Sequence, residues 1–356
     1  MFSVNELRKK LPDAHTAALV ATAHNRRYLT GFPSTASLVL VTKESACFMT
    51  DSRYAEAAGR AIGHMEVLCY SRPMETLKEQ LVRLDITTVL VESERSVASV
   101  RSLREALADI TVDDSDTLTD WLSQLRMVKS AEEMEAVRRA QALTDAGFAY
   151  ILGRIAAGRT EREVAMDLEF EIRRQGAEGV AFEFIAVSGA NSSLPHGVPG
   201  DKVIEAGDFV TMDFGARVDG YCSDMTRTVA VGHVSDRQRE VYDTVLKAQL
   251  ASLDRVGPGV SCREADAAAR EVIAAAGYGA YFGHGTGHGV GVEIHEAPNL
   301  TPNAPQGLRL APGHLVTVEP GIYLPGEFGV RIEDMVYITA DGCENLTKSP
   351  KELIIL

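Results

Sequence analysis

A weak internal repeat in the second half of the chain constrains the fold more than any other feature of the sequence. Residues 158–177 and 259–278 each contain Gly, a Thr or Ser followed three residues later by Glu, and a helical stretch that ends at Gly. The Thr/Ser-x-x-Glu spacing is the capping box that opens many helices. Residues 206–215 and 312–321 are also similar to each other. Because repeats usually report repeated structure, we expect two αββ units facing each other across a pseudo-two-fold axis; the uneven gaps leave chance similarity as the alternative.

The first part of the chain shows a different pattern, with short apolar runs that alternate with helical spacing, as in an α/β domain. Expected strands are 17–23, 36–42, 46–50 and 87–92, and expected helices are 52–63, 74–84 and 99–109. Ser130 and Glu133 then form a capping box that opens a long helix at about residue 131. A length of 356 residues favours two domains. We therefore predict an N-terminal α/β domain over 1–125 and a second domain over 126–356.

Charge and composition exclude several classes of partner. The net charge is 36 − 50 = −14, which argues against nucleic acid or an anionic membrane as a partner. No run of 18 apolar residues is present, and the N-terminal residues lack the apolar core of a signal peptide. The cysteines are odd in number and form no CxxC pair, so we expect reduced, mostly buried thiols in a cytoplasmic protein. They are Cys47, Cys69, Cys222, Cys262 and Cys343.

Residues 208–231 carry the first acidic pair. Apolar alternation around a central Arg-Val-Asp-Gly indicates a hairpin. A turn centred between Val218 and Asp219 places Asp213 opposite Asp224, and directly opposed side chains lie about 5 Å apart. Two carboxylates that close repel each other unless a cation or a proton lies between them. A surface hairpin with unrelated aspartates is the alternative, and the apolar neighbours of the first aspartate disfavour it.

A second acidic hairpin spans residues 314–339. Glu319 ends an apolar strand, and Glu333 lies within another. The two-residue period of a strand places Arg331 and Glu333 on one face. The pattern therefore allows either an ion pair between these two residues or a ligand role for the glutamate, because a carboxylate inside an apolar strand is costly without a partner.

Residues 283–298 contain three histidines and five alternating glycines. So many glycines exclude a stable helix, and therefore a helical HExxH zinc site. In a strand, His284 and His288 stand about 13 Å apart, too far to bind one ion unless the strand bulges. His295 points the other way unless the chain bends at the glycines. The histidines are therefore expected to have different functions, and the glycines to leave room for a peptide backbone.

Seven segments of the chain together resemble the pita-bread metallopeptidases, in the branch of aminopeptidase P and prolidase. They are NRRYLTGF (25–32), TDSRYAEAA (50–58), SGANSSLPHG (188–197), VTMDFGARVDGYCSDMTRT (210–228), GHGTGHGVGVEIHEAP (283–298), VTVEPGIY (316–323) and GVRIED (329–334). The resemblance covers the whole chain. It implies a creatinase-like mixed α/β N-terminal domain followed by a pita-bread catalytic domain built from the duplicated αββ unit.

The resemblance also implies a two-metal centre. Its ligands would be Asp213, Asp224, His288, Glu319 and Glu333, with Asp224 and Glu333 bridging the ions. Asp213 would complete one coordination shell, and His288 with Glu319 the other. Four carboxylates balance two divalent cations, and one nitrogen among oxygens suits Mn²⁺ first, with Co²⁺ or Zn²⁺ as alternatives. Paired ions lower the pKa of a shared water and stabilise an oxyanion.

The remaining family positions are occupied as well. His196 resembles the histidine near the scissile bond, His284 the one beside the specificity pocket, and His295 the one that stabilises the tetrahedral intermediate, while Arg331 resembles the arginine that orients a ligand glutamate. The implied activity is hydrolysis of the bond between an N-terminal residue and proline, in a homodimer. Dipeptide and longer substrates both remain open. A non-catalytic peptide-binding module and a creatinase-like amidinohydrolase are disfavoured, because such members lose metal ligands and this chain keeps all five.

Overall fold

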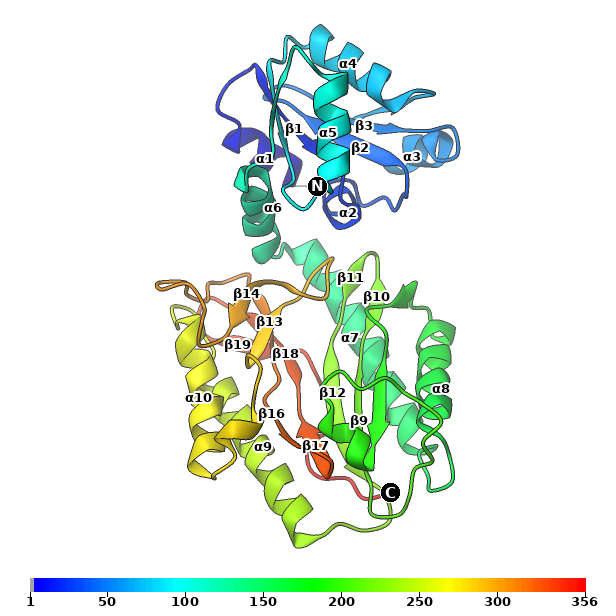
Figure 1. The fold of residues 1–356 in the computed structure, drawn as a ribbon, viewed down its shortest axis with the longest axis vertical. Helices are drawn as coiled ribbons and strands as arrows, with labels where there is room; N and C mark the ends of the chain where they lie inside the picture. The colour runs from blue at the N-terminus through cyan, green and yellow to red at the C-terminus, as the bar shows by residue number, and fades with distance from the viewer. Residues whose placement is uncertain (1–2) are drawn as a thin grey trace. The chain divides into compact units, whose positions relative to one another are not determined.

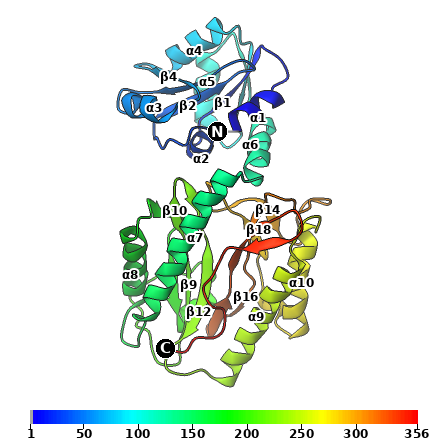
Figure 2. The ribbon, with the colours of Figure 1, turned by 180° about the vertical axis from the view of Figure 1, so that it is seen from behind.

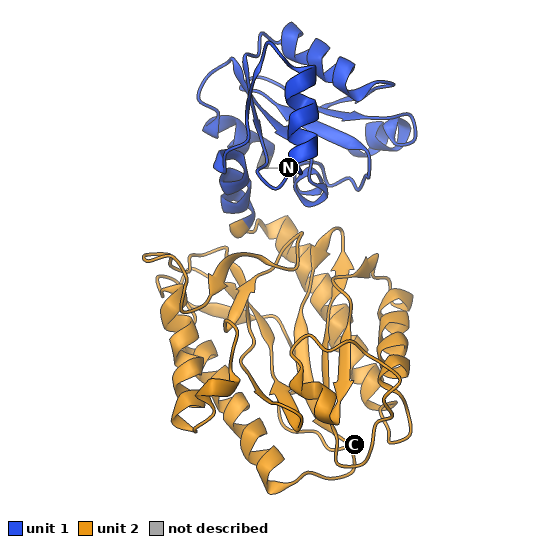
Figure 3. Cartoon of the chain, viewed as in Figure 1, with its two compact units in different colours: residues 1–126 blue, residues 127–356 orange. Residues whose placement is uncertain are grey.

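The computed structural model describes residues 3–356. The chain divides into two compact units, Met1–Arg126 and Met127–Leu356 (Figure 3). Within the described residues, no helix combines the length and apolar character needed to cross a membrane. All five cysteines are free thiols, and three of them are buried.

The first unit is a mixed six-stranded sheet with the strand order β4-β3-β2-β1-β5-β6. Its strands are β1 (Thr16–Val20), β2 (Ser37–Val41), β3 (Ala46–Thr50), β4 (Glu66–Cys69), β5 (Thr88–Val91) and β6 (Thr111–Asp113). Its helices are α1 (Ser3–Lys10), α2 (Ala23–Thr30), α3 (Ala55–Ala61), α4 (Pro73–Arg83), α5 (Val97–Ala106) and α6 (Thr117–Met127) (Figures 1 and 2). The predicted α/β class of this domain is confirmed.

Strand β1 shows why both faces of this sheet are covered by helices. Ala18 and Val20 lie in a core shared with α1, α2 and α6, whereas Ala17 and Leu19 lie in a core shared with α4 and α5. Alternate side chains of a strand point to opposite faces. A strand that is apolar at every position is therefore buried on both sides.

The sequence predicted the central strands and three of the helices but missed the margins of this unit. Strands β4 and β6 are short edge strands with partly exposed side chains, so they show no continuous apolar run. Residues 21–23 were predicted as strand, but α2 begins at Ala23. A Thr at the start of a helix and an apolar run before it give the same local signal as a longer strand.

The second unit begins with a long helix and continues as two similar halves. The helices are α7 (Ala131–Leu152), α8 (Glu161–Arg174), α9 (Asp236–Arg255) and α10 (Cys262–Ala275). The first half contributes β7 (Gly179–Val180), β8 (Ile185–Ser188), β9 (Phe209–Phe214), β10 (Ala216–Val218), β11 (Tyr221–Cys222) and β12 (Met225–Ala230). The second contributes β13 (Gly287–Gly289), β14 (Glu296–Leu300), β15 (Leu315–Val318), β16 (Gly321–Leu324), β17 (Phe328–Arg331), β18 (Asp334–Ile338) and β19 (Cys343–Asn345).

Equivalent contacts confirm the duplication predicted from the repeat. Thr160 and Ser261 cap α8 and α10, each within a complete capping box. Each cap also forms an isolated β-bridge to the segment that leads into the next strands, Thr160 to Val203 and Ser261 to Arg309. The third predicted capping box, at Ser130, is present at the start of α7. Local capping and the strand contacts that follow it therefore agree between the two halves.

The strands of the second unit lie between two helical layers, α7 with α8 and α9 with α10 (Figures 1 and 2). One sheet has the order β12-β9-β8, and another has the order β14-β13-β15-β18-β19. The first comes from the first half of the repeat and the second from the second half. Residues far apart in the chain are thereby brought to one central region.

The register of the first acidic hairpin differs from the prediction. Asp213 pairs with Thr226 rather than with Asp224. The turn is made by Asp219 and Gly220, both with positive φ (49° and 91°), which is the two-residue turn that Asp-Gly favours. Its centre lies one residue further along than predicted, so the two aspartates are not directly opposed.

Candidate metal centre

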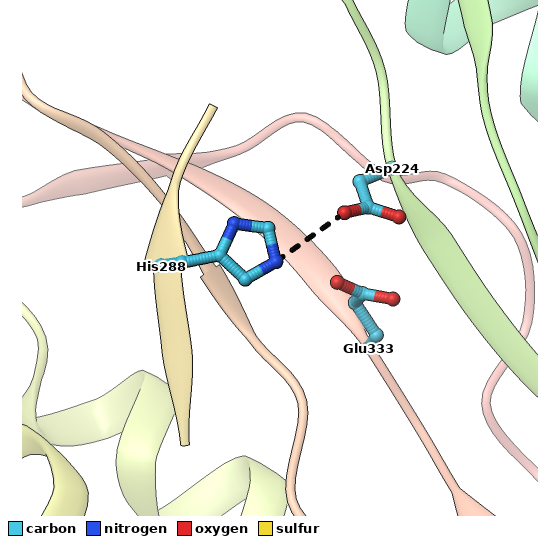
Figure 4. A group of neighbouring side chains, drawn as sticks. All are labelled: Asp224, His288 and Glu333. Atoms are coloured by element: carbon cyan, nitrogen blue, oxygen red, sulfur yellow. Dashed lines mark ion pairs between the residues drawn. The ribbon is translucent and has the colours of Figure 1, made fainter. Parts of the chain in front are cut away.

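Three side chains from three separate segments form a potential metal-binding group at the centre of the second unit. Asp224 precedes β12, His288 lies on β13, and Glu333 lies between β17 and β18. Their potential ligand atoms all lie within 4.8 Å of one another (Figure 4). Asp224 and Glu333 are buried, with 4% and 1% of their surface exposed. Two carboxylates this close repel each other unless a cation or a proton lies between them.

The imidazole of His288 presents a lone pair to carboxylate oxygens. Its Nδ1 lies 3.0 Å from the carbonyl oxygen of Gly289, which only accepts, so Nδ1 carries the proton. Burial, with His295 nearby, lowers the pKa of His288 to about 4, so the ring is neutral and Nε2 is an acceptor. Nε2 nevertheless faces Oε1 of Glu319 at 3.3 Å and Oδ2 of Asp224 at 3.6 Å. Facing acceptors require a proton or a cation between them.

Without a bound cation, the environment of Asp224, Glu319 and Glu333 disfavours the ionised form of each carboxyl group. Burial and the neighbouring carboxylates raise the pKa of Asp224 and of Glu333 well above their ordinary values. Burial, with the Asp213 carboxylate, raises the pKa of Glu319 to about 8. A bound cation reverses this effect because it favours the ionised form of each ligand.

Two carboxylates each have one fixed oxygen and one unsatisfied oxygen. Oδ2 of Asp213 accepts from Arg331 at 2.7 Å, and Oε2 of Glu333 accepts from the Thr226 hydroxyl at 2.7 Å. Oδ1 of Asp213 and Oε1 of Glu333 are buried and have no hydrogen-bond partner. Buried acceptors left unsatisfied are costly, and oxygen donors with one imidazole nitrogen suit a divalent cation. The residues present therefore fit divalent metal ions.

Arg331 serves a different carboxylate from the one that its strand period indicated. Its Nη2 pairs with Asp213, and its Nε donates to the Thr226 hydroxyl at 3.0 Å. No hydrogen bond to Glu333 is recorded for it among the described contacts. Of the two alternatives that the strand pattern left open, the Arg331–Glu333 ion pair is therefore absent from the described contacts. Thr226, on the neighbouring hairpin, links the two residues instead.

Tyr323 connects the arginine to a histidine and was missed by the sequence reasoning. Nη1 of Arg331 donates to the Tyr323 hydroxyl at 2.8 Å, and that hydroxyl lies 3.0 Å from Nε2 of His284. Nδ1 of His284 donates to the Gly285 carbonyl oxygen at 2.8 Å, so Nε2 accepts from the tyrosine. Burial raises the pKa of Tyr323 to about 12 and lowers that of His284 to about 4. The tyrosine at the end of the VTVEPGIY segment was the available signal.

The remaining two histidines, His196 and His295, line the same cavity as the metal-binding group. The ring of His295 lies 4.4 Å from that of His288, centroid to centroid, in an edge-on arrangement. The bend at the glycines therefore returns His295 to the region of the strand's other histidines. Desolvation lowers the pKa of His295. His196 is exposed on the loop that follows β8.

The alternating glycines make room for the protein's own strands. A Cβ at Gly287 would lie 2.0 Å from the carbonyl oxygen of Thr317, and one at Gly289 would lie 2.3 Å from that of Ala297. The ladder between β13 and β14 also shifts register between these two glycines. The expectation that the glycines leave space for a substrate backbone is not supported at these positions, because the close approach is to β15 and β14.

One cavity of about 950 Å³ contains all nine side chains predicted from the sequence, and Tyr323 as well. The nine are His196, Asp213, Asp224, His284, His288, His295, Glu319, Arg331 and Glu333. The wall also includes Phe182, Phe184 and Ile294. An acidic centre with apolar walls is suited to a small ligand that carries both charged and apolar groups.

A buried ion pair contacts the backbone of the metal-binding group and was not predicted from the sequence. Arg227 and Asp334 pair at 2.8 Å, with at most 1% of either side chain exposed. Nη1 of Arg227 donates to the backbone carbonyl of Glu333, and Lys351 donates to Asp334 at 2.8 Å. These contacts fix the backbone at Glu333. The only sequence signal for them was Asp334, an acidic residue directly after Glu333.

Comparison with known proteins gives matches over both units. The model of metallopeptidase family M24 matches residues 135–340, and that of the creatinase/prolidase N-terminal domain matches residues 4–128. The Xaa-Pro dipeptidase of Pyrococcus horikoshii is 36% identical, with 95% of this chain and 94% of the relative covered.

Solved structures agree with this match. The Xaa-Pro dipeptidase from Bacillus anthracis has a TM-score of 0.95 and 43% identity, with 99% of each chain covered. The X-Pro aminopeptidase from Thermotoga maritima has a TM-score of 0.89 and 38% identity, with 96% of this chain and 97% of that chain covered. The creatinase-like and pita-bread architecture is confirmed. The chain belongs to metallopeptidase family M24 and is a peptidase that depends on divalent metal ions.

Proposed function

We propose that this peptidase hydrolyses the bond between an N-terminal residue and proline in short peptides. The observation that carries the proposal is the set of buried carboxylate oxygens around Nε2 of His288, at the base of a partly apolar cavity. The Xaa-Pro peptide bond has no N–H and proline fixes φ, so apolar walls such as Phe182 and Ile294 suit the ring. The similar proteins named above carry Xaa-Pro activities in their names.

Five residues would hold two divalent ions, with Asp224 and Glu333 as the shared ligands. Asp213 would complete one shell, and His288 with Glu319 the other. When bound, the ions would activate a water for attack and stabilise the oxyanion that forms. Mn²⁺ is our first assignment, with Co²⁺ or Zn²⁺ as alternatives, because the donor set is mainly oxygen.

The protein's own groups orient these ligands. Arg331 holds one oxygen of Asp213, and the Thr226 hydroxyl holds one oxygen of Glu333. The Thr317 hydroxyl lies 3.3 Å from Oε1 of Glu319 and accepts from the backbone N–H of His288. Such contacts to metal ligands fix their orientation before the ion binds.

The three other histidines would act on the substrate. The lowered pKa values of His284 and His295 keep both rings neutral at neutral pH, so neither repels the metal ions. A neutral imidazole donates one N–H to a carbonyl oxygen and accepts at its other nitrogen. We assign His295 to the tetrahedral intermediate, His284 to the specificity pocket, and His196 to the region of the scissile bond.

Metal removal tests this function. We expect hydrolysis of an Xaa-Pro dipeptide to vanish when a chelator strips the protein, and to return when Mn²⁺ or Co²⁺ is added. The reason is that two divalent ions balance the buried carboxylates and supply the attacking group. Rates measured before and after dialysis against the chelator check this. Activity that the chelator leaves unchanged would contradict the proposal.

The alternative of a non-catalytic peptide-binding module gains no support from the similar proteins, which are named as peptidases.

A cytoplasmic location is proposed from the free thiols, because reducing compartments preserve them.

We also propose a homodimer assembled through the N-terminal domain. Light scattering is expected to give twice the 38.5 kDa mass of one chain, whereas deletion of residues 1–126 is expected to give a monomer mass. A full-length protein that scatters as a monomer would contradict this assembly.

A further inference from the structure

The cavity that holds the acidic centre continues to one face of α8. Its wall there is formed by Arg162, Ala165, Met166 and Glu169. These positions follow the i, i+3, i+4, i+7 spacing of a single helix face. The same cavity therefore joins the metal-binding group to one face of this helix.

This wall exposes apolar surface. Met166 and Val198 both line the cavity, and they are 64% and 84% exposed. Large apolar side chains left in water are unfavourable, and adjacent ones mark surfaces that bind a ligand. Because the surface is continuous with the acidic centre, the natural occupant is more of the substrate.

The wall also carries an available positive charge. Arg162 pairs with Asp201 at 3.0 Å, and their side chains are 55% and 86% exposed. Such surface pairs contribute little and exchange readily. Arg331, the other arginine in the cavity wall, is buried and bound to Asp213, Tyr323 and a backbone carbonyl. Among the described residues of this wall, Arg162 is thus the arginine open to an incoming carboxylate.

We propose that the wall of Arg162, Ala165, Met166 and Val198 binds the residues that follow proline in substrates longer than a dipeptide, with Arg162 pairing with their C-terminal carboxylate. The inference rests on the proposed Xaa-Pro activity and specifies its substrate class. From Arg162 to Glu169 the helix rises by roughly 10 Å at 1.5 Å per residue. An extended peptide covers that length with about three residues. The fitting substrate is therefore a pentapeptide of the form Xaa-Pro-Xaa-Xaa-Xaa.

The test compares an Xaa-Pro dipeptide with that pentapeptide on the metal-loaded full-length protein. We expect both to be cleaved. Arg162→Gln and Met166→Glu should each raise KM for the pentapeptide by about fivefold, the effect of about 1 kcal/mol, and leave kcat/KM for the dipeptide unchanged. With the wild-type protein, a C-terminally amidated pentapeptide should have a KM about fivefold higher than the pentapeptide with a free carboxylate. Arg162→Gln should not raise the KM of the amidated peptide further.

Two matched controls lie on the same helix outside the cavity wall. Phe170 is 69% exposed, so Phe170→Glu adds the same charge as Met166→Glu. Arg174 pairs with Glu171, so Arg174→Gln removes a paired arginine elsewhere on α8. Neither should change KM for either peptide.

The outcomes separate this inference from the function on which it rests. A dipeptide cleaved without any cleavage of the pentapeptide overturns the inference and leaves the Xaa-Pro activity standing. Controls that shift KM as much as the wall variants also overturn it. If metal-loaded protein cleaves neither peptide, the proposed function itself fails.

Discussion

Glu333→Gln is expected to lower kcat/KM for an Xaa-Pro dipeptide by about 10³-fold or more, because a proposed shared metal ligand loses its charge. The same change should stabilise the metal-free protein. Glu333 is 1% exposed and its pKa is raised by burial and nearby carboxylates, so its ionised form is unfavourable there. The amide keeps an oxygen for the Thr226 hydroxyl and removes the charge.

Steady-state kinetics at saturating Mn²⁺ and urea unfolding of the metal-free protein measure the two effects. Glu327→Gln provides the control, because Glu327 is a surface carboxylate with 48% of its side chain exposed and an arginine partner. It should alter neither quantity. A Glu333→Gln protein that keeps its full rate at saturating metal would remove this residue from the ligand set.

The metal-free protein is expected to lose stability as the pH rises from about 4.5 to about 8. The folded-state pKa of Glu319 is raised to about 8, and the pKa values of Asp224 and Glu333 are raised in the same direction. Between the ordinary carboxyl pKa and the raised one, the folded state binds more protons than the unfolded state. The free energy of unfolding therefore falls with rising pH across that window.

Urea unfolding at a series of pH values, with chelator and with Mn²⁺, measures this dependence. Each unit of pKa difference corresponds to about 1.4 kcal/mol, so the metal-free slope should be large. Bound metal should abolish the slope, since it favours the ionised ligands. Glu333→Gln should reduce the slope of the metal-free protein, because one raised group is gone. A flat profile for the stripped wild-type chain would mean that the carboxylates are not held together in solution.

The sequence located the side chains that line the cavity better than it located their hydrogen-bond partners. Local capping signals were sufficient for the starts of α7, α8 and α10, because a cap is a contact between residues three positions apart. The similarity of residues 206–215 to residues 312–321 also aligns Asp213 with Glu319. Both side chains line the one cavity.

Register and long-range contacts escaped the sequence for physical reasons. A turn centre one residue further along, set by the positive φ of Asp219 and Gly220, placed Thr226 rather than Asp224 opposite Asp213. That threonine then joins Arg331 to Glu333, a link across 105 and 107 residues of chain. Strand period alone specifies a face, and the partner across the face depends on a register that the turn decides.

The five proposed ligands are made at different times during synthesis. Asp213 and Asp224 come from the first half of the repeat, and His288, Glu319 and Glu333 from the second. The first and last of them are 120 residues apart (333 − 213), which at about 5–20 residues per second is roughly 6–24 s of translation. A nascent chain thus carries the two aspartates before His288, the one imidazole among the proposed ligands, has been made. The proposed set of ligands is consequently complete only once Glu333 has been made, and a truncated chain that ends before Glu333 leaves the ribosome with an incomplete set.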